Sequence, residues 1–127
     1  MRVLVCGGRD YVDREHVWRA LDDIHAAHGI DLLIDGGASG ADALARQWAV
    51  ERRVRGWTFM ANWEAHGRAA GPIRNSRMLV EGKPDLVVAF SGGAGTRSMV
   101  RKALAAGVQV MRQDMAPAGG DRREEGA

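Results

Sequence analysis

Residues 85–97, DLVVAFSGGAGTR, decide the fold of this chain. Their five consecutive apolar residues, Leu86–Phe90, are typical of a strand buried on both faces, and a glycine-rich turn and a helical pattern follow at once. In such a unit, the N–H groups of the first helical turn have no partner within the helix and lie at the positive end of its dipole. The stretch therefore predicts a site that binds an anion such as phosphate.

Two similar glycine turns follow apolar segments earlier in the chain. They are residues 7–11 (GGRDY) and residues 35–42 (DGGASGAD). Hydrophobic periodicity and helix-capping signals predict the remaining elements. The predicted strands are Arg2–Cys6, 31–34, 57–60, Leu86–Phe90 and 108–111, and the predicted helices are Arg14–His28, a helix from a Ser39 cap to about residue 53, 72–80 and 96–106.

This alternation of strands and helices predicts an α/β fold. Right-handed crossovers give a Rossmann-like three-layer α/β/α sandwich with a five-stranded, mainly parallel sheet. Every turn that follows a strand then lies at one edge of the sheet, so the three glycine turns would border one crevice. Residues 1–112 are predicted to form a single domain, and residues 113–127, which have no periodicity, a disordered tail.

Composition limits the kinds of ligand and the cellular location that we expect for this chain. The formal net charge of +2 is too small to support non-specific DNA binding, so a bound phosphate would occupy a pocket rather than a basic surface. No apolar run approaches the roughly 20 residues of a membrane helix. A single cysteine, Cys6, favours a reducing compartment, and we expect a cytoplasmic location. The four histidines show no metal-binding spacing, so we expect no metal site and no cofactor beyond a nucleotide-type ligand.

The candidate ligand-binding residues come from the three glycine turns and from residues 71–78 (GPIRNSRM). Arg9 would neutralise a phosphate, Asp10 would accept a hydrogen bond from a ribose or base, and Tyr11 would stack or donate. Arg74 and Arg77 share a helix face near the positive end of a dipole, which favours an anionic partner. The full set is Gly7, Gly8, Arg9, Asp10, Tyr11, Gly37, Ser39, Gly40, Asp42, Arg74, Asn75, Arg77, Gly92, Gly93, Gly95 and Thr96, with no catalytic residue assigned.

Several of these residues have a purely structural alternative. Ser39 and Asp42 are also spaced as helix-capping residues, and that explanation is at least as good as ligand contact. Gly37 and Gly40, around the same helix start, indicate a close approach of the backbone to the ligand. We expect Cys6 to pack in the core rather than act as a nucleophile. For Trp63 we expect burial in the core, and a position at the border of the pocket is the alternative.

In order, the motifs GGRDY, GGASGAD, GPIRNSRM and FSGGAGT resemble the small YpsA-related branch of the SLOG superfamily, over about residues 2–112. The superfamily includes the Lonely-guy phosphoribohydrolases and the DNA-processing protein DprA. The resemblance implies a Rossmann-like domain, a pocket for a nucleotide-type ligand related to NAD or ADP-ribose, and a homodimer. Lonely-guy enzymes carry a P-G-G-x-G-T-x-x-E pattern with a catalytic glutamate; here Ser91 stands at the proline and Met99 at the glutamate.

Three functional hypotheses follow. The first is a binding module that holds a nucleotide or nucleotide derivative as a sensor or processing domain. The second is a hydrolase of N-glycosidic or phosphoribosyl bonds, in which Asp10 or Asp42 replaces the missing glutamate, because methionine cannot transfer a proton. The third and weakest is single-stranded DNA binding, for which affinity would rise with oligonucleotide length and fall steeply with salt.

Overall fold

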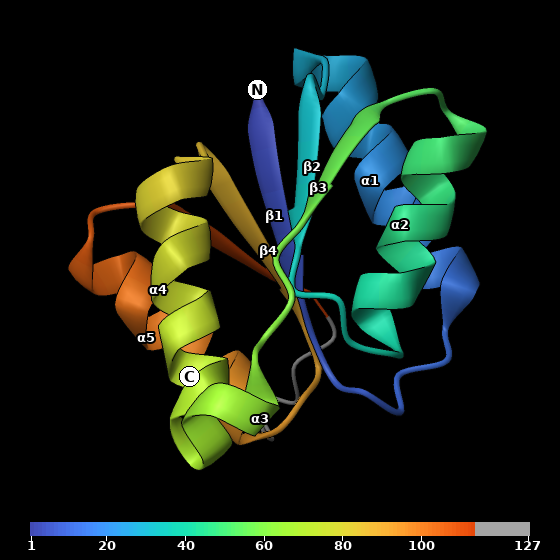
Figure 1. Cartoon of the computed structure of the whole chain (residues 1–127). Coiled ribbons are helices and arrows are strands. Elements are labelled where there is room, and N and C mark those ends of the chain that lie inside the picture. Colours follow the sequence, from blue (N-terminus) through green and yellow to red (C-terminus); the bar gives the residue numbers. More distant parts are fainter. Residues whose placement is uncertain (114–127) are drawn as a thin grey trace, which may run out of the picture.

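The computed structural model describes residues 1–113 and confirms the Rossmann-like α/β arrangement (Figure 1). Its strands are β1 (Arg2–Cys6), β2 (Leu32–Asp35), β3 (Arg55–Thr58), β4 (Leu86–Phe90) and β5 (Gln109–Gln113). Its helices are α1 (Arg14–His28), α2 (Ala41–Glu51), α3 (Trp63–His66), α4 (Ala70–Gly82) and α5 (Ala94–Ala105), with a short 3-10 helix, Gly67–Ala69, before α4. The predicted tail lies outside the described residues except for Gln113, which ends β5.

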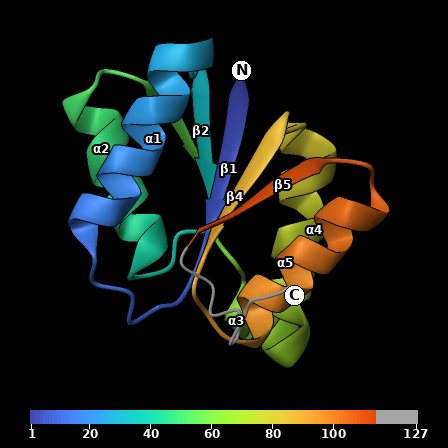
Figure 2. The same cartoon turned by 180° about the vertical axis from the view of Figure 1, so that it is seen from behind.

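The five strands form one sheet in the order β3-β2-β1-β4-β5, and all neighbouring strands are parallel. Helices α1 and α2 cover one face, while α4 and α5 cover the other (Figure 2). The strand order reverses between β1 and β4, which is the switch point where open α/β sheets bind ligands. None of the helices in residues 1–113 combines the length and the apolar composition needed to cross a membrane.

Burial on both faces of the sheet explains the unbroken apolar strands. Val3 and Val5 pack against α1 and α2, whereas Leu4 and Cys6 pack against α4 and α5. All five residues of β4 are buried as well. The expectation that Cys6 lies in the core is therefore confirmed, and the central strands form a rigid base for the turns that follow them.

The largest differences from the predicted elements lie between β2 and α4. The predicted strand 57–60 is wrong by two residues, because β3 is an edge strand whose four residues are all exposed and carry no apolar pattern. The segment between the predicted strand 57–60 and the predicted helix 72–80 contains α3, which begins where the Asn62 side chain accepts a hydrogen bond from Ala65 N (3.0 Å). A helix of four residues without buried side chains leaves no periodic signal in the sequence.

The three glycine turns are hydrogen-bonded to one another. Gly8 N donates to Ser91 O at 2.9 Å, and Ala41 N donates to Gly8 O at 3.1 Å. Gly40 makes the second contact possible, since its φ is 71° and a Cβ there would lie 2.1 Å from Gly8 O. The close approach expected at Gly40 is thus real, but it is an approach to the neighbouring turn.

The prediction that Ser39 caps α2 is wrong. The helix begins after Gly40, without a side-chain cap, and Ser39 Oγ instead donates to Arg9 O at 2.9 Å. Asp42 is the second member of the expected capping pair, and its carboxylate accepts from Gly36 N and Ala38 N within the preceding turn. Both side chains therefore fix the shape of the turns rather than the end of the helix.

Candidate functional site

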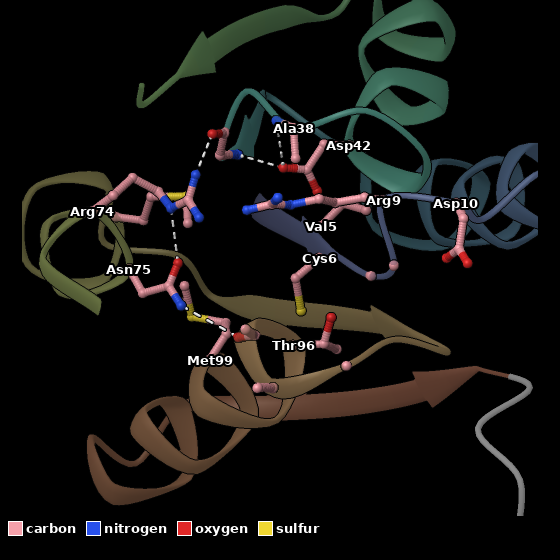
Figure 3. A pocket seen from close by; sticks show the side chains of 17 residues that line it. Val5, Cys6, Arg9, Asp10, Ala38, Asp42, Arg74, Asn75, Thr96 and Met99 are labelled. Atoms are coloured by element: carbon pink, nitrogen blue, oxygen red, sulfur yellow. Dashed lines mark hydrogen bonds between the residues drawn. The ribbon is translucent and has the colours of Figure 1, made fainter. Parts of the chain in front are cut away.

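A cavity of about 570 Å³ opens at the carboxyl edge of the sheet, around the switch point between β1 and β4 (Figure 3). Its walls are the turns after β1 and β2, the first residues of α5 and one side of α4. The sequence predicts that the ligand binds at this edge of the sheet. The predicted residues that line the cavity are Gly7, Gly8, Arg9, Asp10, Asp42, Arg74, Asn75, Gly93, Gly95 and Thr96.

A smaller cavity of about 260 Å³ adjoins the first. The two share Arg9, Gly36, Ala38 and Arg74, and two more predicted residues line the smaller one, namely Gly37 and Ser39. We call them the main cavity and the side cavity. The four remaining predicted residues line neither cavity: Tyr11, Gly40, Arg77 and Gly92.

Contacts within the protein explain why three of those four residues, Tyr11, Arg77 and Gly92, do not line a cavity. The Tyr11 ring lies 5.5 Å from the Phe90 ring. Arg77 pairs with Glu81 at 3.0 Å on the exposed side of α4. A Cβ at Gly92 would lie 2.3 Å from Thr96 Oγ1, so this glycine is required for the turn itself. The periodicity of α4 placed Arg74 and Arg77 on one face but could not say which of them reaches the crevice.

Two arginines converge in the main cavity from opposite sides (Figure 3). Arg9 extends from the turn after β1, and Arg74 from α4 donates from Nη1 to Gly36 O. Within residues 1–113, neither guanidinium forms a salt bridge. Burial lowers the pKa of Arg74, the carboxylates of Asp42 and Asp35 partly oppose this, and the like charge of Arg9 adds to it. Two cations held together in this way would be stabilised by an anion between them.

Asn75 connects Arg74 to α5. Its Oδ1 accepts from Arg74 Nε at 2.9 Å, and its Nδ2 donates to Gly95 O at 3.3 Å. The side chain is buried, so both hydrogen bonds form in a region of low dielectric constant. Asn75 therefore fixes the position of the Arg74 side chain relative to the start of α5.

The first turn of α5 supplies the other anion-binding element. The helix begins after Gly93, which has no side chain to cap it, and its first turn carries no acidic residue. A Cβ at Gly93 or Gly95 would have no neighbour within 4 Å, so the protein interior does not require a glycine at either position. Both glycines leave the N–H groups of this turn open to the main cavity.

A buried carboxyl group lies beside the arginines. Asp42 is 6% exposed, and its Oδ2 accepts from Gly36 N at 3.0 Å and from Ala38 N at 3.3 Å. Burial raises the pKa of Asp42 to about 6, and the nearby charge of Asp35 contributes to the rise. Asp42 can therefore change its protonation state near neutral pH.

The raised pKa of Asp42 makes the stability of the fold depend on pH. Because its folded pKa of about 6 lies above the usual 3.8, this group stabilises the fold below about pH 4, and that contribution is lost as pH rises through 6. The full difference corresponds to about 3 kcal/mol. We expect the stability of Asp42→Asn relative to wild type to increase between pH 4.5 and 7, measured by urea unfolding. A stability difference that does not change with pH would contradict this assignment.

Cys6 and Met99 form part of the apolar floor of the main cavity. Burial raises the pKa of the Cys6 thiol to about 12, with a smaller contribution from Asp42, so the thiol stays protonated and is a poor nucleophile. Met99, at the position of the Lonely-guy glutamate, is 1% exposed. Neither residue offers acid–base chemistry at this position.

Beyond the glycine turn, the side cavity is lined by Met60, Ala61 and Trp63. Sequence reasoning missed Met60 and Ala61, and it gave Trp63 a position at the pocket only as the alternative to core burial. The expectation that Trp63 is buried in the core is wrong, since 48% of the residue is exposed. Its ring lies 5.6 Å from the Arg9 guanidinium. Trp63 comes a few residues after a strand that ends at the ligand edge, and this position indicates a place near the ligand. A lone tryptophan, however, is more often a core residue.

The comparisons agree with the family that the four motifs suggest. The YspA, cpYpsA-related SLOG family matches residues 1–66, which include the first two glycine turns. The chain is similar to the gene 61 protein of Mycobacterium phage D29, with 40% identity over 118 residues that cover 87% of this chain and 94% of that protein. No solved structure matches the chain. The chain belongs to the YspA, cpYpsA-related SLOG family.

Proposed function

We propose that this protein binds a nucleotide or nucleotide derivative in the main cavity, as a sensor or processing domain. The observation that carries the proposal is that Arg9, Arg74 and the uncapped first turn of α5 line the same cavity. Guanidinium groups and helix N-terminal amides are both phosphate-binding groups, and here they border one cavity. Membership of the SLOG family supports a nucleotide-related role.

The rest of the main cavity suits a ribose. Asp10, Asp42 and Thr96 add carboxylate and hydroxyl groups to the walls, and such groups accept hydrogen bonds from sugar hydroxyls. The cavity volume of about 570 Å³ lies within the range of small-molecule sites. NAD, ADP-ribose and nucleoside phosphates therefore are the ligands to test first.

A thermal-shift screen tests the proposal. The purified protein would be melted with ADP, GDP, NAD, ADP-ribose or ribose 5-phosphate, each at millimolar concentration. A ligand that binds only the folded protein raises the melting temperature by mass action. At least one compound should raise it in a dose-dependent way, and no shift with any of the five would contradict the proposal.

Arg74→Ala should weaken the binding of the strongest ligand in that screen by about 10- to 150-fold. The reason is the loss of a charge-assisted hydrogen bond of about 1.5–3 kcal/mol, where about 1.4 kcal/mol corresponds to a factor of ten. The matched control is Arg77→Ala, one turn along α4 and paired with Glu81, which should change the affinity less than twofold. Isothermal titration calorimetry measures both. Equal losses in the two variants would mean that overall charge, not the main cavity, binds the ligand.

A second candidate function is hydrolysis of an N-glycosidic or phosphoribosyl bond. The observation that favours it is the raised pKa of Asp42, about 6, because a general acid works best when its pKa is near the working pH. Chromatography of the protein incubated with each nucleotide separates the two functions, since a hydrolase releases a free base and a binding module does not. Release that persists in Asp42→Asn would exclude Asp42 as the proton donor.

Other properties stay predictions of the sequence. A homodimer, a cytoplasmic location and the weaker alternative of single-stranded DNA binding are each open to direct measurement. For the last, a mononucleotide cavity predicts an affinity that is independent of oligonucleotide length.

A further inference from the structure

We infer that the side cavity is a subsite for the base of the nucleotide, with the aromatic ring of the ligand stacked on Trp63. The inference rests on the proposed function, because the phosphate would occupy the adjoining main cavity. The two cavities differ in the side chains that line them. The main cavity has no aromatic side chain in its wall, whereas Trp63 and Met60 both line the side cavity.

Trp63 and Met60 are large apolar side chains left in contact with solvent. They are 48% and 66% exposed, and neither belongs to the two buried core clusters. Exposing such side chains costs hydrophobic free energy that burial would recover. A planar ring placed between an indole and a thioether would cover both, and every nucleobase offers such a ring.

The Trp63 ring is held in place from two sides. Its edge packs beside Gly71 at the start of α4, where an added Cβ would lie 3.3 Å from the ring carbon Cη2. The Arg9 guanidinium lies 5.6 Å from the ring centroid. The backbone of α3 is fixed in turn by the Asn62 cap. A ring restrained before the ligand arrives loses little side-chain entropy on binding.

Arg9 and Arg74 border both cavities and so join the base subsite to the phosphate site. A nucleotide whose phosphate lies between these arginines has its base within reach of the side cavity. Gly37, which also lines the side cavity, has a φ of 77°, and a Cβ there would lie 2.4 Å from Met60 Sδ. The turn after β2 therefore positions Met60 against the same space, which gives Gly37 a role that its sequence pattern did not specify.

The test compares ADP, which has a base, with ribose 5-phosphate, which has none. Trp63→Ala should weaken ADP binding by about 5- to 150-fold, the range expected from loss of one base–aromatic stack. It should change ribose 5-phosphate binding less than twofold, and Trp63→Phe should keep most of the ADP affinity. ADP should also quench tryptophan fluorescence in the wild type and quench it far less in Trp63→Phe. Calorimetry and fluorescence titration supply these values.

Trp57→Ala is the matched control, since Trp57 is 39% exposed on β3 and lines neither cavity. It should leave ADP affinity unchanged. If Trp63→Ala has no effect on ADP, or weakens ADP and ribose 5-phosphate equally, the base subsite is excluded while the proposed function stands. If the wild type does not bind ADP, the same comparison is made with the strongest base-containing ligand of the screen, and if it binds none of the five compounds, the proposed function and the base subsite are both contradicted.

Discussion

Gly95→Val should weaken nucleotide binding at least about 100-fold while leaving the fold as stable as before. Cβ atoms on a helix tilt toward its N-terminus, so the new side chain would extend from the first turn of α5 into the main cavity. There it would keep a phosphate away from the N–H groups, whose charge-assisted hydrogen bonds contribute about 1.5–3 kcal/mol each. Calorimetry with the strongest nucleotide of the screen measures the loss.

The prediction for Gly95→Val also concerns the stability of the fold. Valine is a better helix former than glycine, and a Cβ at Gly95 would meet nothing within 4 Å. The melting temperature should therefore stay the same or rise. The control is Ala105→Val, which adds a valine at the exposed far end of α5 and should bind as the wild type does. Undiminished binding in Gly95→Val would mean that the first turn of α5 does not contact the ligand.

Gly40→Ala should have the largest effect on the fold. The added Cβ would lie 2.1 Å from Gly8 O and 2.6 Å from the Arg9 carbonyl carbon, and both partners are backbone atoms that cannot rotate away. The φ of 71° adds strain for any residue other than glycine. We expect a loss of more than about 3 kcal/mol, seen as a fall of more than about 10 °C in the melting temperature or as failure to fold.

Gly29→Ala separates the clash from the backbone strain. Gly29 has nearly the same φ, 73°, but a Cβ there would have no neighbour within 4 Å. This variant should lose only about 1–2 kcal/mol. If Gly40→Ala melts at the same temperature as Gly29→Ala, the two glycine turns are not packed as tightly as the structure describes.

The sequence predicts the sheet well because its strands are buried on both faces. β1 and β4 have the predicted bounds, and their unbroken apolar runs have no other simple explanation in a chain of this length. The edge strand β3 is shifted by two residues from its predicted position, since its side chains are exposed and its start is fixed by pairing with β2. Hydrophobic periodicity reports which residues are buried, and the residues of β3 are exposed, so the bounds of this strand could not be predicted from it.

The candidate site is predicted in position but only partly in its details. Glycine patterns show where the backbone approaches something closely, yet they do not show what it approaches. Gly40 and Gly92 lie against protein atoms, whereas Gly93 and Gly95 border open space in the main cavity. The side cavity itself could not be predicted, because it depends on how the segment between β3 and α4 folds. The position of Trp63 in the sequence allowed a place at the pocket only as the alternative to core burial.

The most direct test of the central claim is a titration of ¹⁵N-labelled protein with ADP-ribose, followed by the amide resonances. The account predicts that the largest shifts occur at Gly8, Gly95 and Thr96, whose N–H groups belong to the turn after β1 and the first turn of α5. Arg74→Ala should reduce those shifts at equal ligand concentration. No shift at millimolar ADP-ribose, or shifts confined to the α1 and β5 side of the molecule, would contradict a nucleotide site at the glycine turns.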